Sequence, residues 1–299
     1  MEKKNLMRAG ILIGLVVCFF ITGFSSSALS KVIMEDAEKK EKKEEKLWKR
    51  KLVAQINFSQ FGYSNWAKGG QNAISWNTRV EGEVIRNGGM LSLDLTGIME
   101  FGQTKQEGAK IRNSKDKIDV DCSLSWKVGS YVNPNFTFGL LTQFTTGYDY
   151  SKTPAVPKSN FFDPAYLTQS LGAKINVKNI FKSELGIGLK ETITNKYNQY
   201  ADNPETEEVE KYRFEEGIES KSRLNVDILN GLNVRSKLDM FSSFKHLNII
   251  DVDWDILFTY KLNRYITVTF NTQVIYDRDV VNKTQIKEEM GLGISYSFF

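Results

Sequence analysis

Apolar and polar residues alternate at every second position through most of the chain after residue 50. In the segment 72–85, for example, Trp76 and Val80 fall on one face, whereas Asn77 and Glu81 fall on the other. Successive side chains of a β-strand point to opposite faces, so this period predicts strands with one apolar and one polar face. About twelve can be placed, at 52–60, 72–85, 91–101, 118–128, 136–150, 166–177, 180–194, 212–228, 232–241, 250–261, 265–276 and 285–299.

The connections between these segments alternate in length. Tight connections lie near 87–88, 133–135, 178–179, 230–231 and 262–264, and longer polar ones near 61–72, 102–116, 151–165, 195–211, 242–249 and 277–284. Outer-membrane barrels have short periplasmic turns and long extracellular loops, and an even number of strands leaves both termini periplasmic. The pattern therefore predicts an all-β protein, a transmembrane antiparallel β-barrel with this orientation in a bacterial outer membrane.

A soluble sandwich or lipocalin-like barrel would show the same alternation with its apolar face inside. Strands of about 10 to 14 residues are longer than those of most soluble sheets but match a tilted bilayer crossing. Aromatic residues also gather at strand ends, as in the girdles of membrane barrels. They are Trp126, Phe136, Phe138, Tyr260 and Tyr296 toward the tight turns, and Trp76, Phe101, Tyr148, Phe214 and Tyr276 toward the long loops.

The beginning of the chain has the features of an export signal. Three basic residues precede an apolar run at 11–24, and small residues follow it. This order predicts a signal peptide at 1–30, with the mature chain beginning at Lys31. A lipoprotein modified at Cys18 is the alternative, which is disfavoured because Val17 is bulky where the processing peptidase needs a small residue.

Residues 31–50 carry dense charges of both signs and no apolar face. This composition favours a solvated periplasmic leader. A partner-binding helix, supported by pairs such as Glu38 with Lys42, is the alternative. The barrel domain is then predicted at 51–299.

The last residues add a further sign of a membrane barrel. Aromatic residues alternate after a glycine, and the chain ends on phenylalanine. This ending resembles the insertion signal that the assembly machinery of outer-membrane barrels recognises. Its residues are Gly293, Tyr296, Phe298 and Phe299.

Two loop segments resemble one particular family. Asn65–Asn72, with the sequence NWAKGGQN, and Ser159–Leu167, with the sequence SNFFDPAYL, are similar to hallmark segments of a Bacteroidota outer-membrane barrel family known as domain of unknown function 3078. The resemblance covers residues 48–299. It implies the barrel and its location, and it implies no activity.

The residue types offer little for catalysis or metal binding. His246 is the only histidine, and Cys122 is the only thiol that remains after signal cleavage. A hydrolase built on Ser242 or Ser243 with His246, or on His246 with Asp251 and Asp253, is a minor alternative, because a lone loop histidine is more often a surface residue. We expect no enzyme activity, metal or cofactor. Cys122 shares the apolar face of its segment and is predicted to face lipid.

The polar faces of the predicted strands carry many charges of both signs. A lipid-facing lysine or arginine near the bilayer midplane costs about 2–4 kcal/mol, so these side chains are predicted to line the lumen. The principal candidates are Arg79, Glu81, Glu83, Asp94, Asp119, Asp121, Lys127, Glu219, Arg223, Asp227, Arg235, Asp239, Asp253 and Asp255.

Two functions follow from these faces. A narrow passive or ligand-selective conduit, mildly selective for cations because of the acidic excess, is the first hypothesis. A non-conducting scaffold or surface-binding barrel, with charges that pair and fill the interior, is the second. Expected partners are the lipid bilayer, lipopolysaccharide, the barrel-assembly machinery and an unidentified surface or periplasmic protein. The net charge of +4 gives no support for nucleic-acid binding.

Charge also predicts the register of the hairpin around residues 230–231. Pairing Asp227 with Arg235 and Arg223 with Asp239 would cancel charges, whereas the neighbouring same-face register would oppose Arg223 and Lys237. Opposed like charges are unfavourable, so the first register is predicted.

Two long loops carry large aromatic residues. Phe161 and Phe162 lie in the proline-rich loop 151–165, and Trp66 lies beside two glycines in the first long loop. We predict that these loops fold against each other and constrict the mouth of the barrel. Local packing of each aromatic on its own rim is the alternative.

Overall fold

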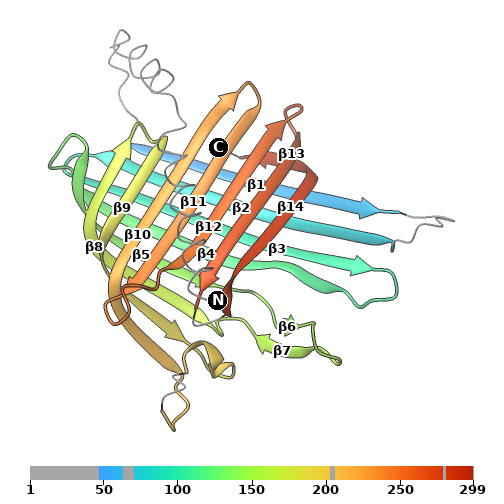
Figure 1. Cartoon of the computed structure of the whole chain (residues 1–299). Helices are drawn as coiled ribbons and strands as arrows, with labels where there is room; N and C mark the ends of the chain where they lie inside the picture. The colour runs from blue at the N-terminus through green and yellow to red at the C-terminus, as the bar shows by residue number, and fades with distance from the viewer. Residues whose placement is uncertain (1–46, 63–70, 203–205, 279–280, 299) are drawn as a thin grey trace. The chain divides into compact units, whose positions relative to one another are not determined.

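The computed structural model describes residues 47–62, 71–202, 206–278 and 281–298. Twelve antiparallel strands form a closed barrel, in which each strand pairs with its sequence neighbours and β1 pairs with β14 (Figure 1). The barrel strands are β1 (Trp48–Phe61), β2 (Ala73–Gly88), β3 (Leu91–Gln106), β4 (Arg112–Trp126), β5 (Val132–Thr142), β8 (Ala165–Val177), β9 (Phe181–Ile193), β10 (Tyr212–Leu229), β11 (Leu232–Ser243), β12 (Asp251–Lys261), β13 (Ile266–Asp277) and β14 (Val281–Ser297).

The distribution of side chains is inverted relative to a soluble protein. Large apolar residues are exposed on the outer face, such as Leu171 at 64% and Met290 at 69%, whereas Asp119 is 6% and Lys221 is 5% exposed inside. Lipid solvates an apolar outer face, and a closed barrel leaves no unpaired strand edge in the membrane. The chain therefore forms a transmembrane antiparallel β-barrel of twelve strands, as the alternation predicted.

The two ends of the barrel differ. The short-turn end holds the connections at residues 89–90, 127–131, 178–180, 230–231 and 262–265, together with the first residue of β1 and the last of β14. The long-loop end holds the remaining connections. Among them, the predicted long loop at 102–116 is much shorter, because β3 and β4 extend into it and leave only 107–111 outside the strands. The predicted long loop at 277–284 is shortened in the same way, because β13 continues to Asp277 and β14 begins at Val281.

The prediction for the fifth strand was wrong beyond Thr142. The chain leaves the barrel wall there and forms a small hairpin of β6 (Gly147–Asp149) and β7 (Val156–Ser159) before β8. Asp116 on β4 stabilises this departure, because its carboxylate accepts hydrogen bonds from the backbone N–H groups of Phe144, at 2.6 Å, and Thr145, at 2.9 Å. Tyr148 therefore belongs to this hairpin and not to an aromatic girdle of the wall.

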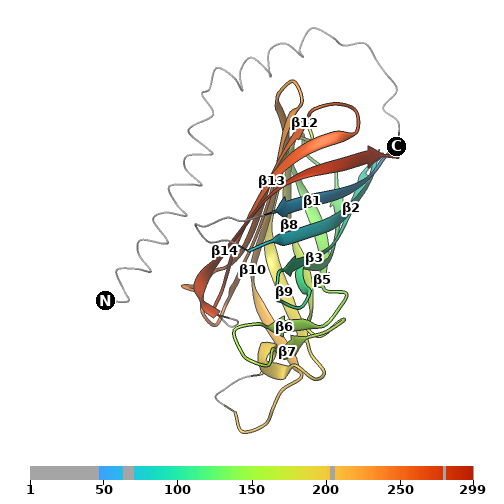
Figure 2. The same cartoon turned by 90° about the vertical axis from the view of Figure 1, so that its right-hand side faces the viewer.

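The loop that contains β6 and β7 is attached to the loop between β9 and β10 (Figure 2). The buried Asp163 accepts hydrogen bonds from the backbone N–H groups of Asn195, at 3.0 Å, and Lys196, at 2.8 Å. That second loop includes the one-turn helix η1 (Asn198–Tyr200). No helix among the described residues is long and apolar enough to cross a membrane.

The start of the barrel differs slightly from the prediction, since β1 begins at Trp48 and takes in the last three residues assigned to the leader. The predicted signal peptide and residues 31–46 of the predicted leader lie outside the described residues.

A close approach of two strands requires glycine on β8. Gly172 is paired with Gly186 on β9, and a Cβ atom at Gly172 would collide with the carbonyl of Leu185 and the backbone of Gly186. Gly97 on β3, by contrast, has open space around the position of its missing Cβ. The two glycines therefore offer a matched pair for substitution.

We predict that the folded barrel migrates faster than the boiled protein in gel electrophoresis, and that Gly172→Ala lowers the temperature at which this fast band disappears. The reason is the backbone collision, which has to separate β8 from β9. Gly97→Ala, with the same added methyl group, should leave that temperature unchanged. Equal behaviour of the two variants would contradict the close approach, and migration independent of heating would contradict the barrel.

The second prediction concerns Cys122, which lies between Leu95 and Phe138 on the outer face of β4. Its neighbour Ser123 points into the lumen, where its hydroxyl accepts a hydrogen bond from Lys174 at 3.0 Å. A membrane-impermeant maleimide should label Cys122 slowly in membrane sheets that are open on both sides, and the double variant Cys122→Ser, Ser123→Cys quickly. The reverse order of rates would show that the faces of β4 are exchanged.

Candidate functional site: the charged lumen

The lumen is crossed by ion pairs between two opposite walls. Carboxylates on β2, β3 and β4 meet lysines and arginines on β8, β9, β10 and β11. The alternation along each strand places these residues on the inner face, and the long lysine and arginine side chains extend across to the opposite wall. The lumen is therefore both charged and bridged.

One cluster occupies the middle of the lumen, and we call it the Asp121 cluster: Asp119, Asp121, Lys221, Arg223 and Lys237. Asp121 on β4 pairs with Arg223 at 2.6 Å, Lys237 at 2.8 Å and Lys221 at 3.1 Å. Lys237 also pairs with Asp119 at 2.6 Å. Three cations on β10 and β11 thus share one carboxylate on β4.

Further ion pairs lie on either side of this cluster. Toward the short-turn end, Asp94 pairs with Lys182 at 2.5 Å and Lys174 at 3.4 Å. Glu81 pairs with Arg79 at 3.2 Å and with Arg235 from β11. The contacts of Lys174, Lys182 and Arg235 join the same two walls as the Asp121 cluster does.

Amide side chains fill the lumen beneath β1, β2 and β14. Gln55 donates a hydrogen bond to Asn57 at 3.0 Å, Asn57 donates one to Asn77 at 2.9 Å, and Asn77 donates one to Glu289. The cavity left among these residues has a volume of only about 10 Å³. This side of the barrel is closed by hydrogen bonds.

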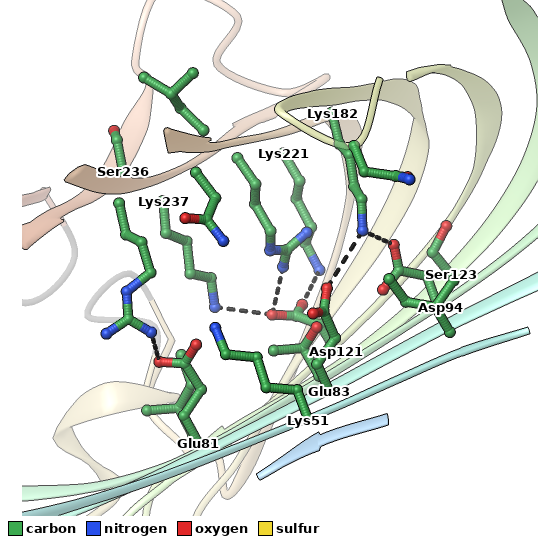
Figure 3. Close-up of a pocket in the computed structure, with 18 of the residues that line it drawn as sticks. Lys51, Glu81, Glu83, Asp94, Asp121, Ser123, Lys182, Lys221, Ser236 and Lys237 are labelled. Carbon is green, nitrogen blue, oxygen red and sulfur yellow. Dashed lines mark hydrogen bonds and ion pairs between the residues drawn. The ribbon is translucent and has the colours of Figure 1, made fainter. Parts of the chain in front are cut away.

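Two larger cavities lie on opposite sides of the Asp121 cluster. The short-turn cavity has a volume of about 360 Å³ and includes Glu81, Asp94 and Lys182 in its lining (Figure 3). The long-loop cavity has a volume of about 340 Å³ and is lined by residues such as Lys190 and Asp251. Asp121, Lys221 and Lys237 border both cavities. The cluster is therefore the layer that separates them.

The two cavities carry opposite charge. Of the described residues that line the short-turn cavity, ten are basic and six are acidic. Of those that line the long-loop cavity, seven are acidic and three are basic. The acidic excess anticipated for the whole lumen is thus confined to one end.

The predicted register of the β10–β11 hairpin was wrong. Arg223 lies opposite Lys237, Asn225 opposite Arg235, and Asp227 opposite Asn233. The like charges of Arg223 and Lys237 are tolerated because both contact Asp121 from the opposite wall. A partner across the lumen, which the hairpin alone does not show, compensates the repulsion between neighbours.

Two predicted lumen residues lie elsewhere. Lys127 is exposed in the turn after β4, beyond the end of the wall. Asp227 is exposed near the end of β10 and accepts a hydrogen bond from Asn233 at 2.9 Å. Both positions fall at strand ends, where the alternating pattern continues past the membrane-spanning part.

The remaining predicted acids have local or cross-lumen partners. Asp253 accepts a hydrogen bond from Gln273 at 2.9 Å and Asp255 accepts one from Asn271 at 3.2 Å. The other contacts are Glu83 with Lys182 at 3.5 Å, Glu219 with Lys221 at 3.2 Å, and Asp239 with Lys237 at 3.3 Å.

Several charged lumen residues were missed. Glu100 pairs with Arg79 at 2.8 Å and Lys115 at 3.2 Å, and Lys117 pairs with Asp119 at 3.0 Å. Lys115 and Lys117 precede the strand start predicted at 118, although they share the odd-numbered face of Asp119. Extending the predicted strand by three residues, to Lys115, would have found both lysines.

Only part of the predicted aromatic constriction at the mouth falls within the described residues. Phe161 and Phe162 contact each other with ring centroids 5.8 Å apart, and they are 59% and 41% exposed. Neither borders the cavities described above. Trp66 lies outside the described residues, so the contact between the two loops stays a prediction. Among the described residues, the constriction is the Asp121 cluster.

The predicted insertion signal lies at the end of β14. Tyr296 and Phe298 are exposed and contact each other edge to face, with centroids 4.9 Å apart. Gly293 lies where a Cβ atom would collide with Asn57 of β1. Phe299 lies outside the described residues.

Among the described residues, no side-chain hydrogen bond joins Ser242 or Ser243 to His246. His246 is exposed in the loop after β11, and the Ser242 hydroxyl donates to the backbone carbonyl of Ile249 at 3.0 Å. In the described part of the chain, no group of three histidine, cysteine or acidic residues is arranged to hold a metal ion.

Comparison with known proteins identifies one family match. The family described as Protein of unknown function (DUF3078) matches residues 58–148, which is less than half of the chain. This stretch contains the Asn65–Asn72 segment and ends before the Ser159–Leu167 segment. No curated protein matches the chain.

Several solved barrels resemble the chain weakly. The translocator domain of the autotransporter NalP from Neisseria meningitidis has 8% identity and a TM-score of 0.35, with 90% of this chain and 95% of that chain covered. The COG4313 outer membrane channel from Pseudomonas putida F1 has 8% identity and a TM-score of 0.37, with 83% and 94% covered. The NanC porin has 9% identity and a TM-score of 0.37, with 83% and 98% covered. Likenesses at these scores carry no argument about function.

The register of the β10–β11 hairpin yields a prediction. In a Cys122→Ser background, the double variant Arg223→Cys, Lys237→Cys should form a disulfide under mild oxidation, because directly opposed residues have Cα atoms within the range of a disulfide. The pair Asp227→Cys, Arg235→Cys should not, since these residues are not opposed. Gel mobility without reductant distinguishes the outcomes. Crosslinking of the second pair alone would contradict the register of the structure and support the one predicted from charge.

Proposed function

We propose that this protein is an outer-membrane barrel that forms a narrow conduit for small charged solutes, closed at mid-lumen by the Asp121 cluster. The observation that carries the proposal is the pair of cavities that meet at Asp121, Lys221 and Lys237. An interior that served only as a scaffold could be filled by side chains along its whole length. Two charged hollows in series are instead what a blocked water-filled passage leaves.

The closing layer is made of contacts that can exchange. Ion pairs between lysines and carboxylates can be replaced by pairs with water or with a passing ion when the lumen is hydrated, whereas a packed apolar plug has no such alternative partners. The cluster is also bordered by water-accessible cavities on both sides. It therefore suits a gate better than a permanent plug.

The proposal includes the setting of the barrel. The exposed apolar outer face calls for lipid, and the expected orientation has both termini in the periplasm and the long loops outside, where they would meet lipopolysaccharide. Insertion by the barrel-assembly machinery, a Bacteroidota source and the absence of enzyme activity belong to the same proposal. The resemblance of the loop segments and the terminal aromatic residues support it.

A non-conducting scaffold remains the second candidate, and a specific observation favours it. The carboxylates and cations of the two walls pair with one another throughout the middle of the lumen, which is how a rigid, closed barrel would satisfy its interior charges. The two candidates differ in whether ions pass.

Single-channel recording in planar bilayers tests the proposal. The wild-type barrel should show small conductance steps, and Asp121→Asn should raise the step size by about twofold or more, because removing the carboxylate leaves three cations that repel one another and hold water. Asp94→Asn is the matched control, since it also breaks a pair of lumen lysines but does so outside the shared layer. Its conductance should equal that of the wild type.

Folding has to be followed in both variants, because breaking a buried ion pair costs about 3–5 kcal/mol. Retention of the fast band in unboiled gels shows that a variant is assembled. If assembled wild-type and Asp121→Asn barrels both fail to conduct, the scaffold is correct and the conduit is refuted.

A further inference from the structure

Basic side chains outnumber acidic ones in the lining of the short-turn cavity, ten to six. Asp121 is shared by Lys221, Arg223 and Lys237, and Glu81 is shared by Arg79 and Arg235. Lys221, Lys237 and Arg79 have further carboxylate partners outside this lining, whereas Arg223 and Arg235 each share their one described acid with other cations. A cation that shares its acid is incompletely neutralised, which is unfavourable away from bulk water. A mobile anion in the cavity would neutralise it.

Lys51 adds to the same space a cation that has no ion pair among the described residues. It lies on the inner face of β1, opposite Glu83 on β2, and makes no ion pair or hydrogen bond through its amino group with any described residue. Figure 3 shows its side chain extending from the wall into the cavity, with no dashed line to its neighbours. Its charge interacts with the Glu81 carboxylate without a direct contact, and its amino group can still donate hydrogen bonds to a ligand.

Arg235 provides a donor that also lacks an acceptor. One of its terminal nitrogens binds Glu81, whereas its buried Nε has no hydrogen-bond partner in the structure. A buried donor without an acceptor costs about 1–3 kcal/mol, and a ligand in the cavity relieves this cost when the guanidinium turns to bring Nε toward it. The guanidinium borders the cavity together with Lys51.

We propose that the short-turn cavity is a binding site for a small oxyanion, a carboxylate or phosphate solute held by Lys51, Arg223 and Arg235. Guanidinium groups bind carboxylate and phosphate oxygens in a matching planar geometry, and charge-assisted hydrogen bonds of this kind are the stronger ones. The volume of about 360 Å³ lies within the usual range for small-molecule sites. This inference rests on the proposed conduit, for which it names the solute class.

The charge of the other cavity gives the site a direction. An anion at the long-loop cavity meets an acidic lining that includes Asp239, Asp251 and Asp253. The short-turn cavity is where an anion is stabilised, so the site is loaded from, or releases toward, the short-turn end. A solute crossing the barrel has to pass the Asp121 cluster, where Lys221 and Lys237 border both spaces.

Isothermal titration of the purified full-length barrel in non-ionic detergent tests the site. Inorganic phosphate and succinate are the separate probes. The ionic strength is kept low, because salt screens the attraction between the probe and the basic side chains. We expect at least one probe to bind with a stoichiometry of one. Binding of both indicates a general oxyanion site, and binding of one assigns the class as phosphate or carboxylate.

Lys51→Gln should weaken that binding by about tenfold, because it removes a charge-assisted contact. It leaves no carboxylate without its ion pair, so the fast band in unboiled gels should persist. Lys127→Gln, with the same loss of charge in the exposed turn at the same end, should bind as the wild type does. Arg235→Lys, which keeps the charge but lacks Nε, should weaken binding without abolishing assembly.

Binding of neither probe, or equal weakening by Lys51→Gln and Lys127→Gln, would overturn the site. The result is independent of conductance. A barrel that conducts without binding refutes the site and keeps the conduit, whereas one that binds without conducting refutes the conduit and leaves an anion-binding barrel.

Discussion

A charged side chain in a membrane-spanning wall avoids lipid only by turning into the lumen, where it meets other charges in place of bulk water. In this barrel that constraint organises the interior. Carboxylates of β2–β4 bind cations of β8–β11, and the long lysine and arginine side chains bridge the distance between them. The outer face is predominantly apolar as a consequence, because most charges of the strands lie on the lumen side.

The relative size of two interactions explains the register of the β10–β11 hairpin. A favourable or unfavourable pair between neighbouring strands is worth about 0.2–1 kcal/mol, whereas breaking a buried ion pair costs about 3–5 kcal/mol. Placing Arg223 beside Lys237 sacrifices the smaller quantity and allows both to contact Asp121. Pairing within the hairpin is therefore subordinate to pairing across the lumen.

The same bridging divides the remaining space. The Asp121 cluster separates the two cavities, and the amide chain from Gln55 to Glu289 closes the side beneath β1 and β14. Because acids prevail in one cavity and bases in the other, the lumen has a polarity along its axis. A solute of either sign would meet one attractive and one repulsive half, with exchangeable contacts between them. That polarity is the physical basis for both the proposed gate and the proposed anion site.

Alternation along the chain was sufficient to determine the strands, their number and the inner or outer face of residues such as Asp121, because the two-residue period is a local property of an extended backbone. It failed where strands end, as with Lys127, since a loop or turn interrupts the wall without changing the pattern. The departure after Thr142 is stabilised by Asp116, which is distant in sequence from the residues it holds. The pairing of each lumen charge was decided only by the tertiary structure, because closure of the barrel brings β4 opposite β10 and β11, and no pattern within one hairpin contains that contact.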